Sequence, residues 1–425
     1  MSPTLWIIRI RNTNERTNMV NVLEFILYWA IVILPFSVAI SNGMSNTFMG
    51  FIAGAYFIKK IVKRERPFIN TPITLPFLLF LAVAFISMRN SVSLGDSWHG
   101  ITKLLKSGLI FMICAEEIRG IEHIKKIVVS MACGVLITSI DGLWQLKFGW
   151  DFVRGEKVQS SLIELARPTG PFPNPNVMGI YLGLIAPLII GLTLYYYKGR
   201  ELVSWSIISV LAAIGIYITF SRGSGLGLFF SVLFLAFMRR HKVILTLLVS
   251  AILIFPFVMP NNIKNWAKIA NYNPLVFLLN QDRISMYMNA THMISQHPFI
   301  GVGVNTYSKN YGKYKTKEAE NYAHTLDTAY AQNNFFQMAG EMGLIGWGVF
   351  LWFLWLLFRE LLRYYRKSPD LYLKIIALSL AGCFIAFLIN GLTESSLYYS
   401  RVAIMFWFFV GIALSLRKIT DAKRN

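Results

Sequence analysis

The chain alternates long apolar runs with short polar segments. The apolar runs occupy residues 20–41, 46–62, 72–88, 101–116, 127–146, 176–197, 202–220, 223–238, 242–259, 342–358, 373–392 and 401–416. About 20 apolar residues span the hydrocarbon layer of a bilayer as an α-helix, and a helix satisfies its own backbone hydrogen bonds in lipid. The pattern therefore predicts an all-α polytopic membrane protein with about twelve transmembrane helices.

The basic residues predict the orientation of these helices. If the N-terminus is cytoplasmic, the inside segments hold more than half of the 41 Lys and Arg residues, including Lys59-Lys60 and Arg366-Lys367. Short cytoplasmic loops carry such an excess of Lys and Arg. We therefore expect both termini in the cytoplasm.

Two of the outside segments are long, at 147–175 and 260–340. Within the second, Asp282 begins a stretch with apolar residues at helical spacing, and a second helical pattern begins near Asp327. We expect residues 260–340 to form a small helical cap on the outer face of a single integral-membrane domain, residues 1–425.

Composition supports a membrane protein and excludes soluble and disordered classes. Of the residues, 55% are apolar or aromatic and 15% are charged, with a mean hydropathy of +0.52, whereas a soluble domain has about 25% charged residues. The net charge of +20 would suggest nucleic acid in a soluble protein. Here the cytoplasmic loops account for much of it, so we expect membrane lipids and no nucleic acid as partners.

Four arginines lie on the side that the positive-inside rule leaves poor in them. Arg167, Arg222, Arg283 and Arg401 are all predicted outside, at or near the ends of spans. A single such arginine commonly extends to lipid headgroups. Four on one face predict an anionic ligand, because guanidinium pairs bidentately with phosphate oxygens. A lipid diphosphate delivered within the membrane fits this pattern.

Small and rigid residues surround two of these arginines. Gly223 and Gly227 follow Arg222 at the spacing of close helix packing, although such glycines also let a backbone approach a phosphate. Four prolines, at 168, 171, 173 and 175, follow Arg167 and fix a non-helical path into the next span. His292 and His297 are five residues apart and have no Cys or paired carboxylate beside them, so we expect no metal site and no cofactor.

Four stretches resemble one protein family. They are Arg167–Gly179 with Pro-Asn before a span, Ser221-Arg222-Gly223, the Arg283 helix running into His297–Gly303, and Gln332-Asn333-Asn334-Phe335 followed by Glu341–Gly346. Their order, spacing and predicted topology, over roughly residues 20 to 416, resemble the O-antigen ligase and O-antigen polymerase superfamily of bacterial membrane glycosyltransferases.

The resemblance implies a reaction at the periplasmic face of the bacterial inner membrane. The donor would be an undecaprenyl-diphosphate-linked glycan. The acceptor would be lipid A–core for a ligase, or another lipid-linked repeat unit for a polymerase. The transfer would invert the anomeric carbon without a metal. The two arginines that hold the diphosphate in the family correspond to Arg222 and Arg283, and fixed cations there would stabilise the charge of the leaving group.

One position departs from the ligase pattern. Ligases typically carry a His where this chain has Gln332, and an amide orients a hydroxyl but accepts no proton at neutral pH. His324 is one alternative for the base, and a carboxylate such as Glu341 or Asp327 is another. The third alternative needs no strong base, because diphosphate leaves readily and positioning does most of the work.

The remaining candidate residues are expected to contact substrate. They are Arg167, Asn176, Arg401, Glu394 and Lys103. Two functions of other classes stay open, a transporter of lipid-linked glycans and a non-catalytic scaffold of envelope assembly. The chain lacks the two similar halves typical of twelve-span transporters, and its outside arginines argue against a scaffold. The oligomeric state does not follow from the sequence.

Overall fold

A computed structural model describes residues 13–68, 70–160, 166–258, 264–265, 268 and 274–422. A helix occupies each of the apolar runs. These helices are α2 (Thr13–Ile40), α3 (Asn42–Lys63), α4 (Thr74–Ser87), α5 (Leu94–Glu117), α6 (Ile121–Phe148), α7 (Pro175–Tyr195), α8 (Gly199–Ile218), α9 (Arg222–Met238), α10 (Lys242–Val258), α15 (Asn334–Lys367), α16 (Leu371–Asn390) and α17 (Ser400–Ala422).

Seven helices among the described residues are long and apolar enough to cross a membrane. They lie at Arg16–Ile40, Ile121–Phe148, Pro175–Tyr195, Gly199–Ile218, Asn334–Lys367, Leu371–Asn390 and Ser400–Thr420. Two further helices, Thr74–Asn90 and Arg222–Met238, are apolar but shorter. The prediction of an all-α multi-pass membrane protein is confirmed, and the number twelve stays a prediction.

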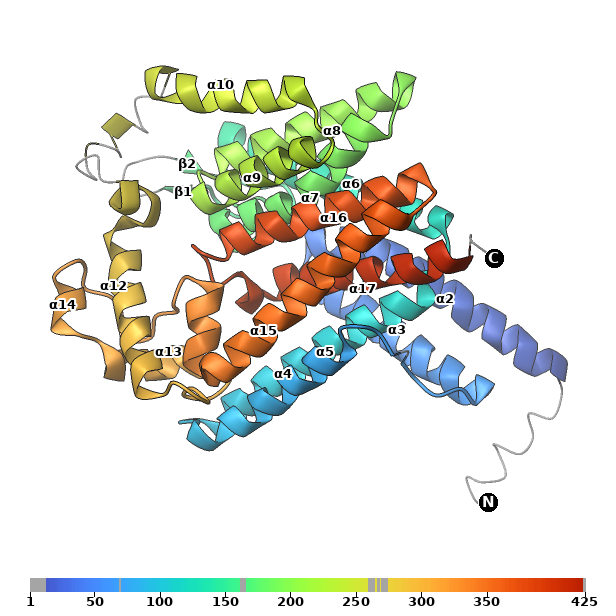
Figure 1. The fold of residues 1–425 in the computed structure, drawn as a ribbon, viewed down its shortest axis with the longest axis horizontal. Coiled ribbons are helices and arrows are strands. Elements are labelled where there is room, and N and C mark those ends of the chain that lie inside the picture. The colour runs from blue at the N-terminus through green and yellow to red at the C-terminus, as the bar shows by residue number, and fades with distance from the viewer. Residues whose placement is uncertain are drawn as a thin grey trace.

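The short helices of the predicted cap lie together beyond one end of the long helices (Figure 1). They are α12 (Pro274–Gln296), α13 (Tyr307–Asn310), the 3-10 helix η2 (Tyr311–Tyr314) and α14 (Lys317–Glu320). A small apolar core of their own includes Met293, Tyr307 and Tyr311. The start of α2 and the end of α17 lie at the opposite end of the bundle, on the right in Figure 1.

The helix that the sequence predicts from near Asp327 does not begin there. Residues 323–333 are not helical, and α15 begins at Asn334, where the side chain of Asn333 accepts hydrogen bonds from the amides of Phe335 and Phe336. Such a cap satisfies amides that a helix start leaves free. The helical spacing of apolar residues placed the start of this helix too early, because spacing does not detect the N-cap residue Asn333.

The turn after His297 packs into a break in α15. Gly343 has φ 68° and ψ −177°, which interrupts the helix. The freed carbonyls of Gly340 and Glu341 accept hydrogen bonds from the amides of Val302 and Gly303, at 2.9 and 3.0 Å. A Cβ on Gly343 would lie 2.1 Å from the carbonyl oxygen of Phe299. Two of the sequence motifs thus form one structural unit.

Gly223 and Gly227 let α9 pack closely against α16 and the turn after it. A Cβ on Gly227 would lie 2.7 Å from the carbonyl oxygen of Ala386, and a Cβ on Gly223 would lie 2.1 Å from the Thr393 hydroxyl. The packing interpretation of this glycine pair is confirmed.

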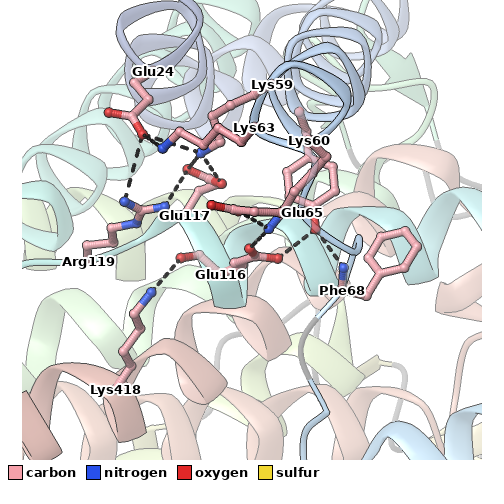
Figure 2. Close-up of polar contacts among 11 residues, drawn as sticks. Glu24, Lys59, Lys60, Lys63, Glu65, Phe68, Glu116, Glu117, Arg119 and Lys418 are labelled. Atoms are coloured by element: carbon pink, nitrogen blue, oxygen red, sulfur yellow. Dashed lines mark hydrogen bonds and ion pairs between the residues drawn. The ribbon is translucent and has the colours of Figure 1, made fainter. Parts of the chain in front are cut away.

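A network of ion pairs joins α2, α3, α5 and α17 at the end opposite α12 (Figures 1 and 2). Lys59 of α3 donates to Glu117 at 2.5 Å, and its neighbour Lys60 pairs with Glu116. Lys59 is 0% exposed and Lys60 is 6% exposed. The sequence pattern suggested solvated loop charges at these two positions. They are buried instead, because two glutamates at the end of α5 compensate them.

A two-stranded antiparallel sheet lies before α7. Its strands are β1 (Gln159–Ser160) and β2 (Ala166–Arg167), with Gln159 paired with Arg167. Residues 161–165 and most of 259–273, which belong to the two predicted long loops, lie outside the described residues.

Candidate functional site

Arg283 is placed by a helix start inside α12. Asn280 has φ 57° and ψ 167°, which breaks the helix, and its side-chain oxygen accepts a hydrogen bond from the Arg283 amide at 3.1 Å. This backbone region is essentially limited to glycine, so Asn280 is strained, and Asn is a favoured N-cap. A new helix begins there and carries the guanidinium of Arg283 toward Glu394.

Glu394 is the acidic centre of the site. It follows α16, and its side chain is 2% exposed. One carboxylate oxygen, Oε1, accepts from Arg283 Nη2 at 2.5 Å and from Asn176 Nδ2 at 2.6 Å. The other oxygen, Oε2, is buried without a hydrogen-bond partner in the part of the chain that the structure describes. Burial raises the pKa of Glu394, while Arg283, Arg167 and the Asn176 hydrogen bond act in the opposite direction.

Arg167 approaches the same carboxylate from β2. Its Nη2 donates to Asn176 Oδ1 at 2.7 Å, and its Nε donates to the carbonyl oxygen of Thr219 at 3.0 Å. Asn176 lies in the first turn of α7, after Asn174, whose side chain accepts from the Val177 amide. Burial lowers the pKa of Arg167, and the charge of Glu394 opposes this effect.

Arg222 completes the cluster as the first residue of α9. It is close enough to Arg283 and Arg167 for their positive charges to interact with its own. Arg167 of β2 and Arg283 of α12 therefore act on one carboxylate, and Arg222 of α9 lies near both arginines. This arginine cluster carries a net positive charge and has the fork geometry that binds phosphate oxygens.

Tyr287 connects the cluster to Gln332 and was not singled out by the sequence. It lies one helical turn after Arg283, and its hydroxyl donates to the carbonyl oxygens of Leu392 at 2.6 Å and of Gln332 at 3.2 Å. Burial raises its pKa to about 12, so it remains a donor at neutral pH. Its spacing of four residues from Arg283 was the available signal.

Strained backbone marks three of these positions. Phe220, Asn280 and Gln332 have φ of 52°, 57° and 50°. Residues other than glycine adopt this region at a cost of about 1–3 kcal/mol, and such strain gathers at functional sites. Each of the three immediately precedes or belongs to a motif of the site.

The other candidates for the base lie in different surroundings. His324 is exposed. Asp327 pairs with Lys315, and its side chain is 81% exposed. Glu341 is 1% exposed, and it accepts hydrogen bonds from the Asn305 and Tyr307 amides, from Gln337 and from the Tyr398 hydroxyl. Both of its oxygens are thus engaged in holding the 301–307 turn against α15.

Arg401 and Lys103 do not join the arginine cluster. Arg401 is 5% exposed and donates to the carbonyl oxygens of Val38, Ala39 and Pro171, with its guanidinium carbon 4.0 Å from the centre of the Phe172 ring. These contacts tie α2 and the proline-rich loop to α17. Lys103 lines a separate cavity on α5.

The two histidines weighed as metal ligands, His292 and His297, both make hydrogen bonds to Tyr314. His297 Nε2 lies 2.8 Å from the Tyr314 hydroxyl, and His292 Nδ1 lies 3.1 Å from the Tyr314 carbonyl oxygen. Within the described ranges, no three His, Cys, Asp or Glu side chains are grouped as a metal site.

The comparisons with known proteins bear on this site. A search of curated proteins gives no match. Residues 207–351 match the family model described as O-antigen ligase, a segment that contains Arg222, Arg283, Gln332 and Glu341. Over this segment, the match supports the resemblance of the chain to the O-antigen ligase and polymerase superfamily.

Proposed function

We propose that this protein transfers a glycan from an undecaprenyl-diphosphate carrier to a hydroxyl of an acceptor, at the periplasmic face of the bacterial inner membrane. The observation that carries the proposal is the arginine cluster, in which Arg167 and Arg283 act on Glu394 and Arg222 lies near both arginines. The match to the O-antigen ligase family supports it over the segment that holds two of these arginines.

The proposed reaction develops negative charge on the leaving diphosphate, the group that the arginine cluster would bind. The acceptor oxygen attacks the anomeric carbon from the face opposite the leaving group, the new glycosidic bond forms, and the bond to the diphosphate oxygen breaks with inversion. The electron pair of that bond leaves with the diphosphate, which gains negative charge. Fixed guanidinium groups stabilise this charge without reorganisation. They take the role of cations, so the proposed step needs no metal.

The acceptor hydroxyl must also lose its proton. Gln332 has no group that accepts it. Glu394 is the carboxylate inside the arginine cluster, its Oε2 has no hydrogen-bond partner among the described residues, and burial raises its pKa toward the range of a base. We propose that Glu394 Oε2 accepts the proton of the acceptor hydroxyl. Donor diphosphate would draw Arg283 away from Oε1 and leave the carboxylate more basic.

Two acceptors fit this chemistry, and one residue bears on the choice. Lipid A–core would make the protein a ligase, and a second lipid-linked repeat unit would make it a polymerase. Gln332 stands at the position where ligases typically carry His. This difference makes the polymerase the second candidate. The retained arginines favour transfer over transport or a purely structural role.

The test is a transfer assay with the purified protein in lipid, without an ion gradient. An undecaprenyl-diphosphate glycan serves as donor, and lipid A–core and a lipid-linked repeat are offered separately. Product on lipid A–core establishes a ligase, and a ladder of longer lipid-linked chains establishes a polymerase. Bound donor with no product on either acceptor would refute the proposed transfer to these acceptors.

A further inference from the structure

A second site lies on the other side of the segment that carries Glu394. A cavity of about 270 Å³ is enclosed by α3, α4, α5, α15 and α17. The segment from Glu394 through the 3-10 helix η3 (Ser396–Tyr398) separates it from the arginine cluster. Glu394 contacts Arg283, whereas Leu397 and Tyr398 line the cavity.

Most of the cavity wall is apolar. Its lining includes Met49 of α3, Leu104 and Ile110 of α5, Met342 of α15, and Ile404 and Trp407 of α17. Long, flexible side chains such as Met adapt to varied apolar partners. The wall therefore suits hydrocarbon chains.

Two lysines of α5 supply positive charge to this apolar cavity. Lys103 and Lys106 both line it, three residues apart and hence on one helix face. Lys103 lies nine residues after the start of α5, about 14 Å along the helix at ~1.5 Å per residue. No carboxylate pairs with either ammonium group among the residues that the structure describes. Both side chains are exposed, so their ammonium groups are accessible to a charged ligand.

The other polar groups of the wall leave this charge uncompensated. His99 lies on the same helix as the lysines. Glu341 also lines the cavity, but its carboxylate is occupied by Asn305, Tyr307, Gln337 and Tyr398. The two lysines are therefore available to an anion from outside the protein.

The ion-pair network at the far end of α3 and α5 explains how the cavity is held open. Lys59 and Lys60, near the end of α3, are paired with Glu117 and Glu116 at the end of α5 (Figure 2). The cavity lies between the opposite parts of the same two helices, at Met49 and Lys103. The helices are thus fixed together at one end and separated at the other.

We propose that this cavity binds the acceptor substrate, as a lipid that carries a phosphate group. The phosphate pairs with Lys103 and Lys106, and the acyl or prenyl chains lie against the apolar wall. Ammonium groups act as point charges on a phosphate, whereas the guanidinium forks of the arginine cluster suit the donor diphosphate. This inference rests on the proposed transfer and names the site of its second substrate.

Lipid binding tests the site without reference to activity. The full chain in detergent is titrated with phosphatidic acid or phosphatidylcholine and examined by native mass spectrometry. We expect wild type to retain phosphatidic acid preferentially and Lys103→Gln/Lys106→Gln to retain about tenfold less. Lys313→Gln/Lys317→Gln removes two exposed charges elsewhere and should bind as wild type does. Equal retention by the Lys103/Lys106 variant would overturn the proposal.

Transfer kinetics then distinguish the two substrates. The Lys103→Gln/Lys106→Gln variant should raise KM for the acceptor about tenfold and leave KM for the donor unchanged, and Lys103→Arg/Lys106→Arg should restore acceptor binding. A rise in donor KM alone would assign the cavity to the donor and refute this proposal. If wild type transfers nothing while lipid retention still depends on the lysines, the phosphate-lipid site stands and the proposed function fails.

Discussion

Glu394→Gln provides the sharpest test of the proposed chemistry. The substitution keeps the shape of the side chain and the Oε1 acceptor for Arg283 and Asn176, but it removes the charge and the proton-accepting oxygen. Removing a general base typically lowers kcat by about 10²- to 10⁴-fold, or about 2.7–5.4 kcal/mol of transition-state stabilisation. We expect a loss in this range, with KM for the donor little changed.

Folding should survive this substitution. Burial holds the pKa of Glu394 above its ordinary value, so the folded state binds the proton more tightly than the unfolded state does. The carboxyl therefore makes folding less favourable as pH rises through this range, and Gln removes that cost. Arg283→Ala has the opposite effect, because it leaves the buried carboxylate without its cation, at a cost of about 3–5 kcal/mol. Adding Glu394→Gln to Arg283→Ala should restore stability.

The assay combines single-turnover transfer with thermal unfolding in the same lipid. Wild-type activity should fall as pH falls through the raised pKa of Glu394, because protonation removes the base. This acid limb should be absent in Glu394→Gln. If Glu394→Gln transfers glycan within a few-fold of wild type, Glu394 is only the counter-ion of Arg283, and the assignment of the proton is refuted.

Three further results follow from the same contacts. Arg222→Ala should lower transfer by at least about 10²-fold while membrane insertion, followed by fractionation and unfolding, stays normal; wild-type turnover would refute the phosphate role of the cluster. Lys59→Gln should lower the free energy of unfolding by up to about 3–5 kcal/mol, because the buried Glu117 keeps only its longer ion pair with Arg119 among the described residues, and Glu117→Gln in the same chain should restore it. Transfer should persist in a strong chelator, since guanidinium groups supply the cations, and loss reversed by one divalent ion would contradict this.

The sequence is sufficient for the helices and insufficient for the contacts between them. Apolar runs predict each long helix, because length and hydropathy are local properties. The contact between Asn176 and Glu394 joins residues 218 positions apart, and the periodicity of a sequence does not report such contacts. The resemblance anticipated Arg222 and Arg283, but the role of Arg401 needed the structure, which shows its donors bound to backbone carbonyls.

Three lysines show why a charge count misleads in such a chain. Lys59, Lys60 and Lys103 all count as basic residues at the edges of apolar runs. The structure separates them, because Lys59 and Lys60 have glutamate partners from α5 while Lys103 faces a cavity. Only spatial pairing distinguishes a compensated charge from one that is available to a ligand.

The pairing of charged side chains differs between the two ends of the helix bundle. Among the side chains in Figure 2, basic groups from α3 and α17 are interleaved with glutamates from α2 and α5, so the buried lysines there are compensated. At the α12 end, the arginine cluster exceeds its one carboxylate, and the cavity lysines have no acidic partner among the described residues. Uncompensated cations within low-dielectric walls concentrate anions at their own position. We therefore expect the phosphate groups of both proposed substrates to bind at the α12 end, where the two proposed sites share a wall.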